Sequence, residues 1–136
     1  MFIRGLINSD PRLKLRGMKV AADLERELGG SGRIDLEYDV QTSQQQALLY
    51  RLNNDRNPLH ADPQEAAKGG FDRPILHGLC TYGIAARVIS ENGICGGKSL
   101  KTIAGRFTNV VYPGDNLSVK AVRELNKINF GVYNAE

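Results

Sequence analysis

The stretch HGLCTYGIAARVISENG, residues 77–93, has the pattern of a long helix that lies close to another surface. Apolar and small side chains recur along it at helical spacing. They are Gly78, Leu79, Gly83, Ile84, Ala85, Ala86, Val88 and Ile89. Asn92-Gly93 is a helix stop. We expect one continuous helix over these residues.

Strand-like segments lie on both sides of this helix. Before it, RIDLEYDV (33–40) alternates apolar and polar residues with a period of two. After it come 100–112, 116–125 and 128–133, separated by turn residues. The order predicts an α+β domain in which an antiparallel sheet wraps around one long helix. Segment 128–133 would then be an exposed edge, which either a truncated chain or a covering partner chain would explain.

The bulk composition is that of a single soluble domain. Its 136 residues carry a formal net charge of +3 without clustering in sequence, which does not indicate a nucleic-acid surface. Two cysteines, Cys80 and Cys95, make no disulfide framework, and we expect Cys80 to be a small buried hydrophobe. No apolar run is long enough for a membrane span. Residues 1–33 hold one weak amphipathic segment (20–28) and are interpreted as a leader or linker.

Two further helices are expected between the first strand and residue 77. Thr42 is a candidate N-cap with Gln45 as its capping-box partner, for a helix that ends near residue 54. Asp62 followed by proline starts a second, with Glu65 in its first turn. In the first helix we expect the residues Ala47, Leu48, Tyr50 and Leu52 to face the interior.

Between these helices, NDRNPLHADP (54–63) places a carboxylate, Asp55, five residues before an imidazole, His60. Pro58 stiffens the segment and favours an extended Asn57. Such a loop could be an ordinary turn, or it could hold an acid/base pair. Both readings remain open on these residues alone.

A second candidate element is His77-Gly78, where the long helix begins. A backbone N–H in the first turn of a helix has no intrahelical acceptor and suits a developing oxyanion. The alternative is that Gly78 is a packing glycine and His77 a helix cap.

Other chemistries are less well supported. Asp55, His60 and His77 could in principle hold a metal, but no H-x-x-x-H or H-E-x-x-H pattern is present and no metal is expected. GICGGKS (93–99) lacks the spacing of a phosphate loop. Lys98, Lys101 and Arg106 could still face the diphosphate of coenzyme A, although solvated surface charge is the simpler interpretation.

Residues 47–87, ALLYRLNNDRNPLHADPQEAAKGGFDRPILHGLCTYGIAAR, strongly resemble the signature of the MaoC-like (R)-specific enoyl-CoA hydratase 2 family. They look most like the catalytic half of the hydratase domain in peroxisomal multifunctional enzymes, and RFTNVVYPGD (106–115) extends the match. The resemblance implies a single hot-dog fold over 34–136, which lacks the family's closing strand. FIRG (2–5) is similar to the end of the first of the family's two repeats.

The resemblance also implies roles for individual residues. Asp55 and His60 would be the catalytic pair, with the Gly78 N–H as oxyanion donor. Asn57, His77 and Pro74 would belong to the substrate-binding site.

The implied reaction is reversible addition of water to a trans-2-enoyl-CoA, giving the (3R)-hydroxyacyl-CoA. No cofactor is implied beyond the coenzyme A of the substrate. A homodimer or higher homo-oligomer, in the cytoplasm of a bacterium or in a peroxisome, is expected. A non-catalytic acyl-CoA-binding or assembly domain and an acyl-CoA thioesterase are the alternatives.

Overall fold

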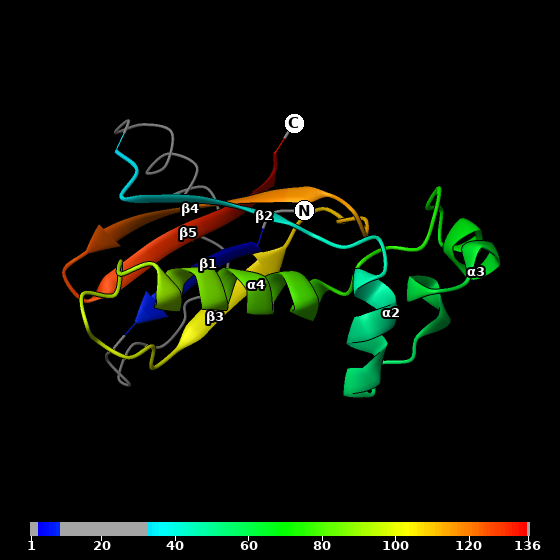
Figure 1. Ribbon diagram of the computed structural model, residues 1–136, viewed down its shortest axis with the longest axis horizontal. Helices are drawn as coiled ribbons and strands as arrows, with labels where there is room; N and C mark the ends of the chain where they lie inside the picture. The colour runs from blue at the N-terminus through cyan, green and yellow to red at the C-terminus, as the bar shows by residue number, and fades with distance from the viewer. Residues whose placement is uncertain (1–2, 9–32, 136) are drawn as a thin grey trace.

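The computed structural model describes residues 3–8 and 33–135, and for 3–8 it describes the backbone. Five strands form one antiparallel sheet in the order β2-β4-β5-β1-β3. The strands are β1 (Ile3–Asn8), β2 (Leu36–Gln41), β3 (Ile103–Phe107), β4 (Asn116–Glu124) and β5 (Lys127–Asn134). Helix α4 (Gly78–Glu91) lies along one face of this sheet (Figure 1). The predicted hot-dog architecture is therefore confirmed.

The core forms where α4 meets the sheet. The buried residues of α4 are Cys80, Thr81, Ala85, Val88 and Ile89. The facing strands contribute Leu117, Val119, Ala121, Ile128, Phe130 and Val132. In the β4–β5 ladder Val119 is opposite Val132 and Ala121 is opposite Phe130. Removal of this apolar surface from water stabilises the helix on the sheet.

Strand β1 corrects two sequence-based expectations. Residues 3–8 were expected in a leader or linker, and 128–133 as an uncovered edge. In the structure β1 pairs with β5 on one side and with β3 on the other. It therefore lies where a missing closing strand would have left β5 exposed, and the sheet edges are β2 and β3. The predicted amphipathic segment 20–28 lies outside the described residues.

The two apolar patterns that precede α4 in the sequence differ in how well they predict burial. In edge strand β2, Leu36 and Val40 are half-buried and pack against the core, as predicted, although Tyr38 is 45% exposed. The predicted helix after it is short, consisting of α2 (Gln46–Tyr50) and the 3-10 turn η1 (Arg51–Asn53). Ala47 is buried, but Leu48 and Leu52 are exposed, contrary to the prediction.

Thr42 does not cap α2, because its side chain has other partners. Its buried hydroxyl donates to the carbonyl of Asp115 (2.7 Å) and accepts from the N–H of Gly114 (3.0 Å). The helix begins four residues later without a side-chain cap. Thr42 therefore ties the end of β2 to the predicted 113–115 turn.

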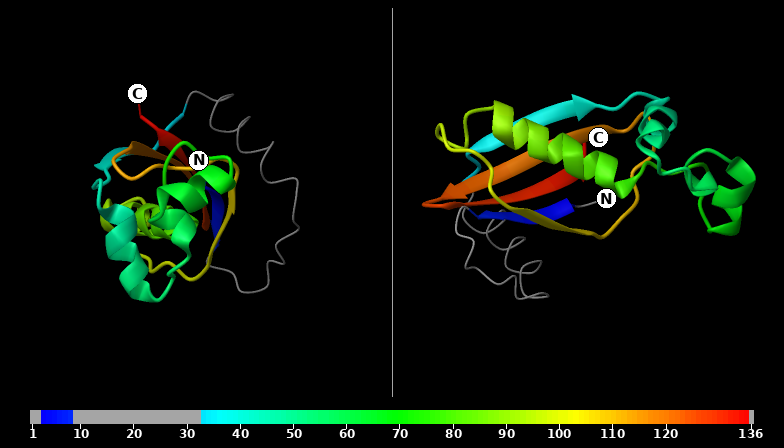
Figure 2. Two further views of the ribbon diagram at one scale, coloured as in Figure 1. Left: turned by 90° about the vertical axis from the view of Figure 1, so that its right-hand side faces the viewer. Right: turned by 90° about the horizontal axis from the view of Figure 1, so that it is seen from below.

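The short helical elements gather beyond the N-terminal end of α4 (Figure 2). They are α2, η1, η2 (Pro58–His60) and α3 (Pro63–Lys68). As predicted, Asp62 caps α3 by accepting from the N–H of Gln64 at 2.8 Å. Among the described residues, no helix has the length and apolar character that crossing a membrane requires.

Candidate active site

The loop from Asp55 to His60 is held by its own backbone and side chains. Asn57 is the N-cap of η2, and its Oδ1 accepts from the N–H of Leu59 at 3.0 Å. Pro58 occupies the first position of that turn, where its fixed φ suits the geometry. Asn57 lies outside the helical region, with φ −53° and ψ 123°, as expected for a residue before proline, and its side chain supports the loop.

The imidazole of His60 is oriented by one hydrogen bond. Its Nδ1 lies 2.7 Å from the carbonyl oxygen of Ile75. A carbonyl can only accept, so Nδ1 carries the proton in the neutral ring. The other nitrogen, Nε2, is thereby left with a lone pair and can act as a base.

His77 lies directly against His60. The two ring centroids are 3.6 Å apart and the ring planes are inclined by 25°. The Nε2 of His77 donates to the backbone carbonyl of Asp55 at 3.1 Å. Burial, at 1% exposure, lowers the pKa of His77, and a charge on His60 would lower it further. His77 is therefore a neutral support beneath the loop that carries Asp55.

This burial corrects two interpretations of His77. It occupies the N-cap position of α4, but its side chain caps no backbone N–H there. Its Nδ1 is buried and has no hydrogen-bond partner among the described residues. At 1% exposure it has no surface for direct contact with a substrate. Its place in the structure is that of a positioning residue.

Asp55, His60 and His77 converge on one point. One ligand-type atom from each lies within 4.8 Å of the others. The Asp55 side chain is exposed, and its Oδ1 accepts a long hydrogen bond from the N–H of Asn57 at 3.4 Å. The Nε2 of His77 donates to the Asp55 carbonyl, so the lone pair of this ring lies on the buried Nδ1. Two of the three groups, Asp55 and His60, are the candidate acid/base pair.

Gly78 is the first residue of α4. In the described part of the chain no acceptor is found for its N–H, as expected in the first turn of a helix. The adjacent segment is fixed by the N–H of Leu76, which donates to the carbonyl of Val111 at 2.7 Å. The dipole of a 14-residue helix adds partial positive charge at this end.

A cavity of about 280 Å³ opens beside His60. Its lining includes His60, Pro74, Pro113, Leu48 and Arg73. Pro74, which was predicted to be a substrate-binding residue, is part of the wall of this cavity. The guanidinium of Arg73 lies over the ring of Tyr112 and 3.6 Å from Asp115. It gives the cavity one cationic group that the sequence interpretation did not identify.

Two more residues behind the pair were missed as site residues. The ring of Tyr50 lies 4.7 Å from that of His77, and burial raises the pKa of its hydroxyl. The Nε of Arg51 is buried without a partner in the described ranges. The adjacent Tyr50-Arg51 pair, four residues before Asp55, offered no distinguishing sequence signal.

The chain is similar to known proteins over most of its length. The family model described as "MaoC like domain" matches residues 31–135. The chain is 51% identical over 86 residues to the 3-hydroxyacyl-thioester dehydratase Y of Mycobacterium tuberculosis, a match that covers 62% of this chain and 30% of that protein. It is 53% identical over 81 residues to the peroxisomal enoyl-CoA hydratase 2 of Arabidopsis thaliana, covering 58% and 26%.

A solved structure extends the similarity to three dimensions. The full-length peroxisomal multifunctional enzyme type 2 of Drosophila melanogaster superposes with a TM-score of 0.69 at 40% identity, over 75% of this chain and 19% of that one. The matches thus span about 30% or less of the lengths of these three relatives.

Proposed function

Because the chain belongs to the MaoC-like domain family, we propose that it adds water across the double bond of trans-2-enoyl-CoA thioesters. The product is the (3R)-hydroxyacyl-CoA, which makes the protein an (R)-specific enoyl-CoA hydratase, a carbon–oxygen lyase. One observation carries the proposal. Asp55 and His60 converge within 4.8 Å, beside the cavity and near the first turn of α4.

The proposed reaction uses each group for one task. Asp55 and His60 hold a water molecule, and the pair takes a proton from it as its oxygen attacks C3. The π electrons of the C2–C3 bond shift toward the thioester, and charge develops on its carbonyl oxygen. The Gly78 N–H stabilises that oxygen, and a proton delivered to C2 completes the addition.

The substrate and its environment follow from the same proposal. The acyl thioester lies in the cavity that His60 and Pro74 line, and Arg73 is available to a phosphate group of coenzyme A. No cofactor is proposed beyond the coenzyme A of the substrate. We propose a homodimer or higher homo-oligomer, located in the cytoplasm of a bacterial source or the peroxisome of a eukaryotic one.

The direct test is hydration of crotonyl-CoA, followed as loss of the absorbance of the conjugated enoyl thioester. We expect Asp55→Asn and His60→Gln to lower kcat by at least a hundredfold, the usual contribution of general acid–base catalysis. Asp62→Asn is the matched control, because Asp62 lies in the same loop and only caps α3. Chiral analysis of the product should give the 3R isomer.

Three results would reject parts of the proposal. Undiminished activity of either active-site variant would remove the assigned pair. Release of free thiol from an acyl-CoA would indicate a thioesterase. Binding of acyl-CoA by a folded sample without turnover would indicate a non-catalytic acyl-binding domain.

A further inference from the structure

A second cavity lies at the opposite end of α4 from Gly78. It has a volume of about 40 Å³ and lies between the loop after α4 and the β4–β5 hairpin. The lining residues used below are Cys95, Lys98, Lys101, Arg123, Glu124 and Lys127. A water molecule needs about 10–15 Å³ of such space, so the cavity has room for a group the size of a few waters.

The residues that line this cavity carry as much net positive charge as the whole chain. Four cations and one carboxylate line it, a net charge of +3. The whole chain has eighteen cations and fifteen anions, also a net +3, so the other residues carry fourteen of each sign. The sequence analysis did not detect this cluster because its members come from segments about 25 residues apart.

The single carboxylate does not neutralise the cluster. Glu124 lies 3.8 Å from Lys127 and accepts from Asn129 at 3.3 Å. Lys98, Lys101 and Arg123 form no ion pair within the described ranges. The nearby Asp35 is held by the Arg33 side chain and by the backbone N–H of Arg123.

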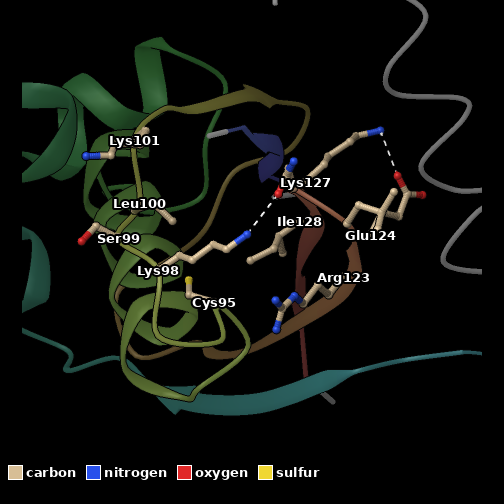
Figure 3. Close-up of a pocket in the computed structure, with 11 residues that line it drawn as sticks. Cys95, Lys98, Ser99, Leu100, Lys101, Arg123, Glu124, Lys127 and Ile128 are labelled. Atoms are coloured by element: carbon tan, nitrogen blue, oxygen red, sulfur yellow. Dashed lines mark hydrogen bonds and ion pairs between the residues drawn. The ribbon is translucent and has the colours of Figure 1, made fainter. Parts of the chain in front are cut away.

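Two of the cations point into the cavity. Figure 3 shows the side chains of Lys98 and Arg123 extending toward its centre, with the sulfur of Cys95 nearby. The Nζ of Lys98 donates to Oδ1 of Asn126 at 3.1 Å, which joins the loop to the hairpin. Lys101 and Lys127 direct their amino groups away from this centre, so they contribute charge from the rim.

The loop is shaped to accept the guanidinium of Arg123. Gly96 has a φ of +59°, and a β carbon there would collide with Nη1 of Arg123. Glycine therefore permits both the backbone conformation and the close approach of the guanidinium. Arg123 lies against this loop, and Lys98 also extends into the cavity. The planar guanidinium of Arg123 and the compact ammonium of Lys98 therefore face the same small space.

This cavity is separate from the candidate active site. Helix α4 has 14 residues and is about 21 Å long. The loop after α4 supplies part of one lining, and segments that precede α4 supply part of the other. Figure 1 shows the short helices α2 and α3 and the loop after α4 at opposite ends of this helix. Lys98 and Lys101 therefore lie in a lining that shares no residue with the cavity beside His60.

We propose that this cavity binds a phosphate group of a soluble phosphate ester, held by Arg123 and Lys98. Arginine pairs with phosphate oxygens through parallel N–H donors, and such charge-assisted bonds are stronger than neutral ones. The rim lysines add long-range attraction that salt weakens. Bound phosphate offsets the mutual repulsion of four cations gathered at one end of the sheet.

Cys95 provides a readout that is independent of hydratase activity. It is partly exposed and lines the cavity, whereas Cys80 is buried. We expect inorganic phosphate to slow the reaction of Cys95 with the thiol reagent DTNB in a saturable way, with sodium chloride used to hold the ionic strength constant. At ten times the dissociation constant the rate should fall about tenfold, since about a tenth of the sites remain open.

Variants decide whether the cavity is responsible. Arg123→Gln and, separately, Lys98→Gln should reduce this protection to less than twofold. Arg87→Gln makes the same change of charge on the outer side of α4 and should keep full protection. Circular dichroism checks that each variant is folded. If either Arg123→Gln or Lys98→Gln fails to fold, the other variant still tests the cavity.

Three outcomes would overturn the proposal. One is protection that does not saturate at constant ionic strength, and another is equal protection in wild type and Arg123→Gln. The third concerns the source of the phosphate. Co-sedimentation with phosphatidic acid vesicles that depends on Arg123, without protection by soluble phosphate, would assign the cavity to a lipid headgroup instead.

Discussion

The imidazole of His77 is stacked on that of His60, with 3.6 Å between the ring centroids. Each ring is also hydrogen-bonded to a backbone carbonyl of the other's segment, His60 to Ile75 and His77 to Asp55. The two histidines therefore cross-link the loop that carries the acid/base pair to the segment that precedes α4. The distances among Asp55, His60 and Gly78 depend on this link.

His77→Phe tests the positioning role. Phenylalanine keeps an aromatic ring against His60 but cannot donate to the Asp55 carbonyl. A net hydrogen bond contributes about 1 kcal/mol, so we expect kcat on crotonyl-CoA to fall by up to about tenfold while KM changes little. His77→Gln supplies an amide donor without the ring, and partial recovery of kcat would identify the hydrogen bond as the important contact. A rise in KM together with a fall in kcat in both variants would contradict a positioning role.

The pH dependence of stability follows from the lowered pKa of His77. Burial lowers that pKa below its usual 6.5, so the unfolded chain binds a proton at a pH where the folded protein does not. Stability is therefore fully present above about pH 6.5 and is lost as the pH falls below it. Urea unfolding at several pH values should show a decline of up to about 1.4 kcal/mol per pH unit.

His77→Phe also serves as the control for this effect, because it removes the titrating group. The decline just below pH 6.5 should become shallower in the variant. Arg33 lowers the pKa of Asp35, so Asp35 also contributes stability that is lost on acidification. That loss occurs at a lower pH, as the pH falls through and below the usual carboxyl range. An unchanged slope in His77→Phe would assign the effect to another group.

Local sequence patterns predicted the elements that form this site but not how the ends of the chain pair. The helix 77–93 is found as α4, because its apolar spacing and its Asn-Gly stop are local signals. The strands β4 and β5 likewise have clear alternation and a short turn between them. The pairing of β1 with β5 was not predictable, since it joins segments about 120 residues apart through backbone hydrogen bonds that any sequence can form.

Sequence indicated the candidate site residues but not their surroundings. The loop with Pro58 made Asp55 and His60 candidates, and the family resemblance implied their role as a pair. The burial of His77 under His60 depends on where α4 meets the loop, and no spacing rule encodes that contact. The cap assigned to Thr42 failed for the same reason, because its partners, Gly114 and Asp115, are some 70 residues away.

Thr42→Val should destabilise the fold although it preserves shape. Valine removes a hydroxyl that makes two hydrogen bonds at a site that is 3% exposed. Leaving their backbone partners unpaired costs about 1–3 kcal/mol in the free energy of unfolding, measured by urea titration. Thr102→Val makes the same change at an exposed position and should change it by about 0.5 kcal/mol or less. Equal effects of the two changes would show that the Thr42 contacts contribute nothing.

Deletion of residues 1–8 tests the role of β1 in the sheet. Without β1, strand β5 and strand β3 both lose their hydrogen-bonding neighbour. Unpaired strand edges promote association between chains, so we expect lower stability and concentration-dependent aggregation, measured by light scattering. Replacement of Arg4 by proline, which keeps the length and removes one backbone N–H, should have a smaller effect in the same direction. A deleted protein that does not aggregate and is as stable as the full chain would contradict the assigned pairing.

The exposed leucines beside the active site predict where a second copy docks. Leu48, Leu49 and Leu52 on α2 and η1, and Leu79 on α4, are 52%, 56%, 81% and 59% exposed. Burial of such side chains in an interface stabilises the complex by about 25 cal/mol per Å² of apolar surface. For the proposed homo-oligomer, Leu52→Gln should therefore shift the mass measured by sedimentation toward the monomer. Leu125→Gln is the matched control, since Leu125 is 94% exposed but lies in the β4–β5 turn, beyond the other end of α4. If Leu125→Gln dissociates the oligomer and Leu52→Gln does not, the docking surface lies at the opposite end of the molecule.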